Sequence, residues 1–381
     1  MIDSNPKPLT SVKLSPLGHI RELDGLRGIA VLLVVFHHLT LDPGMSNGSP
    51  IQVVAHRIFQ YGNAGVDVFF VLSGFLISSL LIRDRQSPAY YQDFYWKRIL
   101  RIFPLYFLIL FLILIFVRGS GTYVVLAAFF VANFASVFHI DQSTVFWSLA
   151  VEEQFYLLWP TVVRKLTPRR LAQCAVAIAA TSVVLRFVAA RLGHHNYYLT
   201  FLHCDGLAAG ALLACLFAKR ERDQLSPDTH DRSMWWAAGI ALPLLLLALL
   251  LPQNTNREEA LAAAILLTGI TLFCFAFVGL LISHSGRQGI AAFRSPVLIF
   301  FGQISYALYL VHTYVMDAFD KWIGRPAAGD TSMFLIRAAC TLIGGVLLSL
   351  LTRYLIELPA LSLRSRVLSR PAPKAETQLP L

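Results

Sequence analysis

The chain has 381 residues, of which 56% are hydrophobic and only 14% are charged, and its mean hydropathy is +0.61. This composition excludes an ordinary soluble protein, because many apolar runs approach the ~20 residues that a membrane-spanning helix needs. The net charge of +10 could suggest a nucleic-acid partner. We predict none, because Lys and Arg cluster in short segments between apolar runs, as the positive-inside rule expects.

Apolar runs set the predicted fold class, an all-α polytopic bundle embedded in membrane lipid, because strand-like alternation is missing. The first run is expected to be a retained helix, since polar residues precede it and no small-residue cleavage site follows it. In chain order the runs lie near 26–40, 62–82, 102–117, 123–138, 146–163, 171–190, 203–218, 235–251, 261–283, 296–316 and 333–356.

Loop charges reduce these runs to about ten net crossings. The cationic segments are the N-terminus, 83–98, 164–170, 219–222, 287–294 and the C-terminal tail. All of them lie on the cytoplasmic side if 123–138 and 146–163 together make one crossing. We therefore predict ten transmembrane helices, cytoplasmic termini, and a re-entrant or broken element near 140–160 that lines a cavity.

Three segments are expected along the chain. Residues 1–22 form a cytoplasmic N-terminal segment, and residues 23–360 form the membrane domain. Residues 361–381 contain three prolines and few apolar side chains, so they are predicted to be a disordered cytoplasmic tail.

Arg27 and His38 are the most informative pair of residues. They are separated by almost three helical turns, so they project from one helix face, roughly 16 Å apart along the axis. Ionisable residues are costly inside a bilayer and usually mark a functional path. Asp24 and His37 accompany the pair and are further candidates.

Arg98 and Arg101 form a second cluster, in the segment WKRILRIFP. They share one helix face at the predicted cytoplasmic mouth. Two guanidinium groups on one face suit phosphate or pyrophosphate oxygens. An ordinary positive-inside flank is the competing interpretation.

Glu152 and Glu153 lie in the middle of the apolar, aromatic segment FWSLAVEEQFYLLWP. A carboxylate in such a place is costly and seldom accidental. We expect it either to orient an imidazole or to donate a proton.

Further polar candidates stand near helix ends. His312 has the stronger functional claim because it is a second titratable base in an apolar run, whereas Asp205 could be structural. Asp67 fits a helix start. The sequence contains no zinc-ligand spacing, Walker loop or nucleophile elbow, so no metal is predicted.

Five ordered motifs resemble those of the membrane acyltransferase-3 family. They are LDGLRGIAVLLVVFHH, GVDVFFVLSGFLIS, KRILRIFPLY, FWSLAVEEQFYLLWP and SYALYLVH, and they cover about residues 20–360. The resemblance implies an integral membrane O-acyltransferase that transfers an acyl group, commonly acetyl, from cytoplasmic acetyl-CoA or another acyl-CoA. It also implies a bacterial inner membrane location.

Matching the family's motifs to this chain implies roles for individual residues. Arg27, Arg98 and Arg101 would bind the phosphates of the acyl-CoA. His38 would act as the base or carry the acyl group, with Glu152 orienting it, and Arg27 would also belong to the catalytic set. Some family members carry an additional extracytoplasmic hydrolase-like domain, which is not expected here.

Three functions remain open from the sequence. The first is acylation of a hydroxyl on an envelope saccharide, such as exopolysaccharide or lipopolysaccharide. The second is acylation of a small hydroxylated molecule, such as a macrolide or glycolipid. A proton-coupled transporter is a third, of another class, because buried His and Glu residues occur in proton relays. The loops near 41–61, 118–122, 252–260 and 317–331 are expected to select the acceptor.

Overall fold

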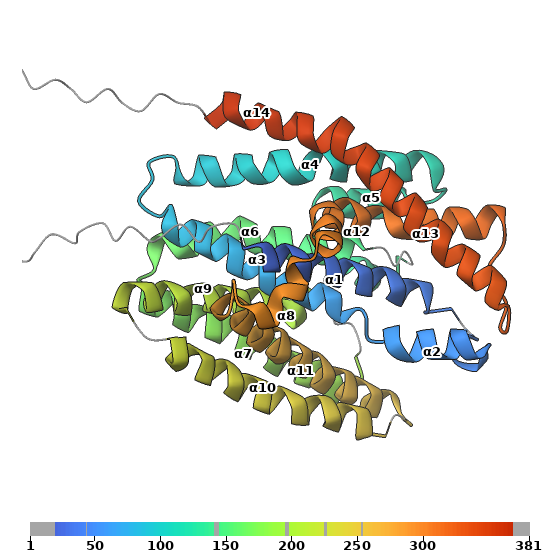
Figure 1. Cartoon of the computed structure of the whole chain (residues 1–381), viewed down its shortest axis with the longest axis horizontal. Coiled ribbons are helices and arrows are strands. Elements are labelled where there is room, and N and C mark those ends of the chain that lie inside the picture. Colours follow the sequence, from blue (N-terminus) through green and yellow to red (C-terminus); the bar gives the residue numbers. More distant parts are fainter. Residues whose placement is uncertain are drawn as a thin grey trace, which may run out of the picture.

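The computed structural model describes residues 20–42, 44–140, 145–194, 198–224, 227–252 and 254–368. In these ranges every regular element is helical, which confirms the predicted all-α class (Figure 1). The long helices are α1 (Arg21–Leu39), α3 (Ala64–Arg83), α4 (Tyr90–Phe116), α6 (Phe146–Lys165), α7 (Pro168–Arg191), α9 (Asp205–Asp223), α10 (Pro227–Leu250), α11 (Asn256–Ser283), α12 (Pro296–Trp322) and α13 (Thr331–Thr352).

Shorter elements join the long helices. They are η1 (Met45–Asn47), α2 (Pro50–Phe59), α5 (Gly121–Ala128), η2 (Ala132–Phe138), α8 (Thr200–His203), η3 (Gln288–Arg294), η4 (Arg353–Glu357) and α14 (Leu358–Leu368). In Figure 1 the long helices run in roughly one direction, with α4 and α14 along one edge and α10 along the opposite edge.

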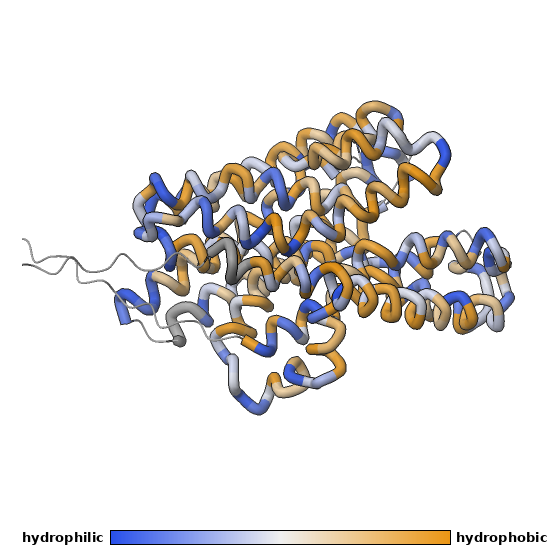
Figure 2. Tube along the Cα trace, turned by 90° about the horizontal axis from the view of Figure 1, so that it is seen from above, coloured by the Kyte–Doolittle hydropathy of each residue, from blue (hydrophilic) through white to orange (hydrophobic). Residues whose placement is uncertain are grey.

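Seven helical segments in the described ranges are long and apolar enough to cross a membrane. They are Pro50–Arg83, Tyr90–Phe116, Pro168–Arg191, Asp231–Leu250, Asn256–Ser283, Pro296–Trp322 and Thr331–Leu363. Three further helices, α1, α6 and α9, have comparable length, but they carry charged side chains that lower their hydropathy. Hydrophobic residues dominate the middle of the helices and hydrophilic ones gather at the ends (Figure 2).

Helix α1 packs against α12 at backbone distance. A Cβ added at Gly28 would lie 2.1 Å from the carbonyl oxygen of Leu298, and one at Gly302 would lie 2.0 Å from that of Asp24. Small residues are the usual means by which membrane helices approach so closely. The close contact fixes α1, with Arg27 and His38, against the helix that carries His312.

Helices α3 and α9 meet in the same way. A Cβ at Gly74 would lie 2.0 Å from the carbonyl oxygen of Leu207, and one at Gly210 would lie 2.1 Å from that of Val71. The two contacts hold α3, which carries Ser73, in the centre of the bundle (Figure 1).

The irregular element lies earlier in the chain than predicted. Residues 146–160 belong to the continuous helix α6, although Pro160 lies inside it. The break falls instead at 121–138, where the eight residues of α5 are followed by a turn and the 3-10 helix η2. Phe130, in that turn, has a positive φ of 55°, which is uncommon for a bulky residue.

The last helix extends past residue 361, where the tail is predicted to begin, and the tail itself stays a prediction. A π-helical turn at Arg353–Glu357 joins α13 to α14, and the helix continues to Leu368, beyond residue 361. Most of the predicted segments 1–22 and 361–381 lies outside the described residues, as do residues 141–144.

Polar contacts connect the loops at each end of the bundle. At one end, Arg164 donates to the carbonyl of Ser87, and the Glu22 carboxylate pairs with Arg294 at 2.9 Å. At the other end, Gln52 accepts from the backbone N–H of Gly329 at 2.8 Å. The last contact joins two of the loops expected to select the acceptor.

Candidate functional site

His38 and His312 meet between α1 and α12. Nε2 of His312 lies 3.3 Å from Nδ1 of His38, and the ring centroids are 5.0 Å apart. Residue 312 is fully buried, whereas residue 38 is half-buried. The sequence named both histidines, and the structure brings them together although 274 positions separate them.

The partners of the two rings define their tautomers. Nδ1 of His312 lies 2.9 Å from the carbonyl oxygen of Tyr309, and Nδ1 of His38 lies 2.9 Å from that of Val34. A carbonyl only accepts, so each Nδ1 must carry a hydrogen. Nε2 of His312 then carries a lone pair, and the single His38 Nδ1–H is shared between the Val34 carbonyl and this nitrogen. The lone pair of His38 therefore resides on Nε2, the position that a general base needs.

His37 has a different role from its neighbour. Its Nδ1 donates to the carbonyl oxygen of Phe59 at 2.9 Å. This bond fastens the end of α2 to α1. His37 thus positions the segment between α1 and α3, whereas His38 is the residue that faces His312.

Three arginines gather near the opposite end of α1. Arg27 interacts electrostatically with Arg98, and Arg101 interacts with both. In the described structure, no carboxylate lies within ion-pair distance of Arg27, Arg98 or Arg101, and no hydrogen bond engages their guanidinium groups. Each guanidinium offers five N–H donors in a planar fork. The three residues therefore form a cationic cluster with unused donors.

Two other buried arginines in the bundle form ion pairs with carboxylates. Arg186 pairs with Asp205 at 2.6 Å and donates to Thr268 and to the carbonyl of Leu202. Arg337 pairs with Asp320 at 2.6 Å. A structural arginine is neutralised by a carboxylate beside it, whereas a binding arginine keeps N–H donors for a ligand. The arginines of the cationic cluster are of the second kind.

Glu152 is held beside the cationic cluster. Ser73 donates to its Oε1 at 3.0 Å, and the Tyr156 hydroxyl donates to its Oε2 at 3.2 Å. The Arg98 guanidinium stacks 3.7 Å from the centroid of the Tyr156 ring. Ser73 and Tyr156 were not predicted as site residues. The sequence predicts Ser73 to be a helix-packing residue, and Tyr156 to be an interfacial or cavity-lining aromatic beside the glutamates.

The expected contact between Glu152 and His38 is not present in the structure. His38 has His312 as its polar side-chain partner, whereas Glu152 interacts with Arg27 and Arg98. Tyr309 lies between the two groups, because it precedes His312 by one turn and interacts electrostatically with Glu152. Helix geometry explains the difference, since α6 presents Glu152 at the depth of Arg27 rather than that of His38.

Glu153 and Glu357 complete the acidic surroundings. Glu153 interacts with Arg98, and Glu357 interacts with Arg101. Among the described residues, one buried oxygen of each carboxylate has no hydrogen-bond partner. Asp24 interacts with Arg27 from the same helix. These carboxylates balance the arginines at a distance without occupying their N–H groups.

Asp205 is a structural residue, because its carboxylate forms the buried pair with Arg186. Asp67 is more than a helix start. Its Oδ1 lies 3.1 Å from Nε2 of His203, a residue that the sequence gave no reason to select.

The cationic cluster remains accessible to solvent. Arg101 is exposed, and Arg27, Arg98 and Glu152 are half-buried. In the part of the chain that the structure describes, no three His, Cys, Asp or Glu side chains converge as metal ligands.

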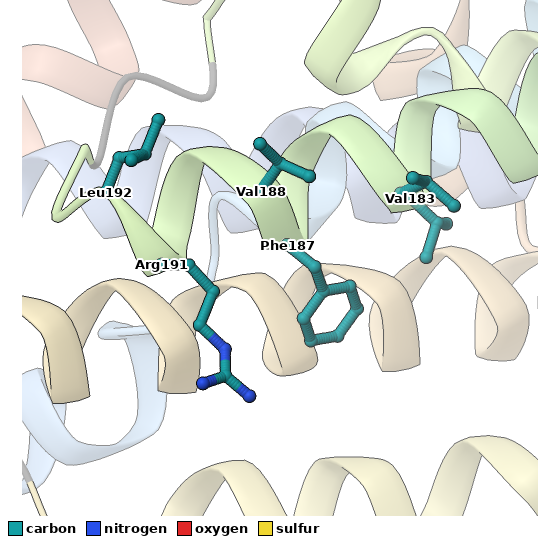
Figure 3. Close-up of a pocket in the computed structure, with 6 residues that line it drawn as sticks. Val183, Phe187, Val188, Arg191 and Leu192 are labelled. Carbon is teal, nitrogen blue, oxygen red and sulfur yellow. The ribbon is translucent and has the colours of Figure 1, made fainter.

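A separate groove on α7 lies outside this site. Figure 3 shows it lined almost entirely by apolar side chains, on the helix that packs beside α11. Several of these side chains are exposed, as expected of a face that contacts lipid. The lining residues are Val183, Val184, Phe187, Val188, Arg191 and Leu192.

The model of the acyltransferase domain family Acyl_transf_3 matches residues 20–354, most of the chain. The chain belongs to this family. The family predicted from the five motifs is thereby confirmed, and the match favours an enzyme over a transporter. No solved structure matches the chain.

Several curated bacterial proteins are similar to this acyltransferase domain. A Staphylococcus aureus (strain COL) protein, provisionally named an O-acetyltransferase, is 26% identical over 80% of this chain and 53% of its own length. The peptidoglycan O-acetyltransferase OatA of Listeria monocytogenes is 26% identical over 77% of this chain and 49% of its own length. The chain thus spans about half the length of the curated relatives it matches.

Proposed function

We propose that this chain is an integral membrane O-acyltransferase that moves an acyl group, in the simplest case acetyl, from cytoplasmic acyl-CoA to a hydroxyl of a cell-envelope saccharide. One observation carries the proposal. Arg27, the member of the cationic cluster on α1, and His38, which among the described residues has no partner at Nε2, lie on the same helix, roughly 16 Å apart along its axis. That spacing separates an anion site from a base and leaves room between them for the extended arm of coenzyme A that carries the acyl group.

The cationic cluster fits the phosphates of a coenzyme A thioester. Nε of Arg98 is buried and, among the described residues, has no hydrogen-bond partner. Arg27 and Arg101 flank it with further donors, and guanidinium forks match phosphate oxygens in a bidentate way. Ser73 and Tyr156 hold Glu152 so that it orients Arg27 and Arg98 without pairing with them.

His38 performs the proton transfer in this proposal. Its Nε2 accepts the proton of the acceptor hydroxyl while the hydroxyl oxygen attacks the acyl carbon. The bond between that carbon and sulfur then breaks, and His38 returns the proton to the leaving thiolate. His312 and the Val34 carbonyl hold the His38 Nδ1–H throughout, as an orienting group does for other catalytic bases. The thioester supplies the activated acyl group.

All ten long helices are proposed to span the membrane, which adds α1, α6 and α9 to the seven apolar segments. Their charged side chains then face the interior of the bundle, as intramembrane ionisable residues usually do. The arginine-rich loops are placed on the cytoplasmic side of a bacterial inner membrane. The cationic cluster would then open toward cytoplasmic acyl-CoA, and His38 toward the outer side.

The proposed acceptor class is supported by relatives whose names include peptidoglycan O-acetyltransferases. A small hydroxylated molecule uses the same hydroxyl chemistry and is the alternative that the test below separates.

The test is transfer of label from [14C]acetyl-CoA in membranes that contain the wild type, His38→Ala or Arg222→Ala. Label is expected in envelope glycan with the wild type and with Arg222→Ala, whose residue is exposed and paired with Asp223. His38→Ala should lower transfer about a hundredfold or more. Transfer that survives His38→Ala would reject the base assignment. Label confined to small molecules would move the acceptor to the alternative class.

A second measurement separates direct attack from an acyl-histidine. The protein is incubated with [14C]acetyl-CoA without acceptor, denatured at neutral pH and analysed for bound label. Direct attack leaves the protein unlabelled, whereas an acyl-histidine labels the wild type and not His38→Ala.

A further inference from the structure

An aromatic group lies beside the proposed catalytic pair and has no part in the chemistry described so far. Trp147, near the start of α6, packs 4.8 Å from the Tyr198 ring and 5.2 Å from the His203 ring, centroid to centroid. Phe70 of α3 contacts both Trp147 and His203. We name Trp147 and Tyr198, which remain accessible, the aromatic platform.

A hydrogen bond beneath the aromatic platform fixes its orientation. His203 and Asp67 are almost fully buried, and their side chains lie 3.1 Å apart. The pair ties α8 to the start of α3 and so holds the ring on which Trp147 packs. The platform is therefore a rigid surface built from three separate parts of the chain.

The aromatic platform is connected to the proposed catalytic pair through Tyr309. The hydroxyl of Tyr309 lies 2.6 Å from Oγ of Ser148, the residue directly after Trp147, and its ring lies 6.2 Å from that of His312. Tyr198 interacts electrostatically with the same hydroxyl. The platform and His38 thus flank one short stretch of α12.

An interfacial belt is the ordinary reason for Trp and Tyr near the ends of membrane helices. The contacts of Tyr198 distinguish it from a belt residue. It is 47% exposed, yet its ring packs 4.8 Å from Trp147, which itself packs on the buried His203. An accessible ring held against a buried cluster can present one face to a ligand.

We infer that the aromatic platform is the acceptor subsite and that it binds a pyranose ring by stacking against Tyr198 and Trp147. The apolar C–H face of a sugar packs on an aromatic ring, and its edge hydroxyls then reach polar groups such as Tyr309 and His38. This inference rests on the proposed function, because it names the sugar face that the transferase recognises. A polymeric glycan and a glycolipid present the same ring, and the experiment distinguishes them.

Binding and transfer are measured separately with the full chain in lipid nanodiscs. Chitotriose serves as the glycan probe and hexyl β-glucoside as the glycolipid probe. Saturation-transfer difference NMR reports binding, and [14C]acetyl-CoA reports transfer. The variants are Tyr198→Ala, Tyr198→Phe and the control Phe201→Ala, which removes a nearby aromatic side chain of equal exposure, 46%.

Tyr198→Ala is expected to weaken binding of the accepted sugar about tenfold, the equivalent of a lost aromatic contact. The acceptor KM should rise equally, while the KM for acetyl-CoA stays unchanged. Tyr198→Phe keeps the ring and should behave like the wild type, as should Phe201→Ala. Saturation transfer to only one of the two probes identifies the accepted sugar as part of a glycan or of a glycolipid.

Different results would overturn the acceptor subsite and the proposed function. Sugar binding that is sensitive to Tyr198→Ala without any acetyl transfer would retain the subsite and reject the proposed function. Binding of neither probe to the wild type, or binding equally strong in Tyr198→Ala, would overturn the subsite. If the subsite is overturned but the wild type still transfers acetyl, the proposed function remains.

Discussion

Nε2 of His312 lies 3.3 Å from Nδ1 of His38 and shares its hydrogen with the Val34 carbonyl, and this contact joins α1 to α12. The close approach of α1 and α12 at Gly28 and Gly302 makes the contact possible. A base whose protonated nitrogen is occupied by a fixed acceptor keeps its lone pair in one place. The same arrangement orients imidazoles in other acyl-transfer enzymes.

His312→Ala is expected to lower kcat about tenfold, with little change in the KM for acetyl-CoA. The loss corresponds to a hydrogen bond of ~1–1.5 kcal/mol that orients the base. His312→Gln places an amide oxygen near the former Nε2 position and should restore most of the rate. Assays of acetyl transfer on the three proteins provide the comparison.

The 15N NMR spectrum of histidine-labelled protein tests the tautomer directly. The wild type should show His38 protonated at Nδ1, and His312→Ala should show a mixture of both tautomers. An unchanged His38 signal in His312→Ala would mean that Val34 alone sets the tautomer and that His312 has only a structural role.

Arg98→Lys should raise the KM for acetyl-CoA about tenfold while kcat changes little. Lysine keeps the charge, but it loses the planar fork and the cation–π contact with Tyr156, which position Arg98 for phosphate oxygens. The matched control is Arg222→Lys, an exposed residue already paired with Asp223. Equal donor KM values in both variants would exclude Arg98 from the donor site.

The sequence was enough to select residues that are costly to place in a membrane, but it could not determine their partners. A His, Arg or Glu within an apolar run stands out from the sequence alone, so we selected His38, Arg98, Glu152 and His312. Which of them meet depends on helix depth and rotation. The structure therefore pairs His38 with His312 and places Glu152 with the arginines.

The position of the irregular element illustrates a second limit. Loop charge showed that one of the runs 123–138 and 146–163 was unusual, and the polar residues of 146–163 made it the candidate although the break lies in the more apolar run. The polar residue Gln154 lies in the middle of α6, and its side-chain amide donates to the carbonyl of Phe130 and to Asn133. This tertiary contact satisfies the side chain and leaves the helix intact, while the strained turn at Phe130 breaks the preceding run.

Asp205→Asn should lower the thermal stability of the protein strongly. It leaves the guanidinium of Arg186 buried without a counter-charge, and removal of one partner of such a pair typically costs about 3 kcal/mol or more. Asp223→Asn is the control, since the Arg222–Asp223 pair is exposed and should contribute nothing measurable. Tm values in nanodiscs give the comparison, and similar values for both variants would contradict a structural role for Asp205.

Gly210→Ala should destabilise the bundle, because its new Cβ would meet the carbonyl oxygen of Val71 at 2.1 Å and force α9 away from α3. Overpacking of this kind costs ~1–3 kcal/mol. Gly239→Ala is the matched control on α10, where an added Cβ meets nothing within 4 Å and helix propensity favours alanine by ~1 kcal/mol. The two substitutions are chemically identical, so their Tm shifts should have opposite signs. A stable Gly210→Ala protein would mean that α3 and α9 are not packed at backbone distance, and that Ser73 is positioned by other contacts.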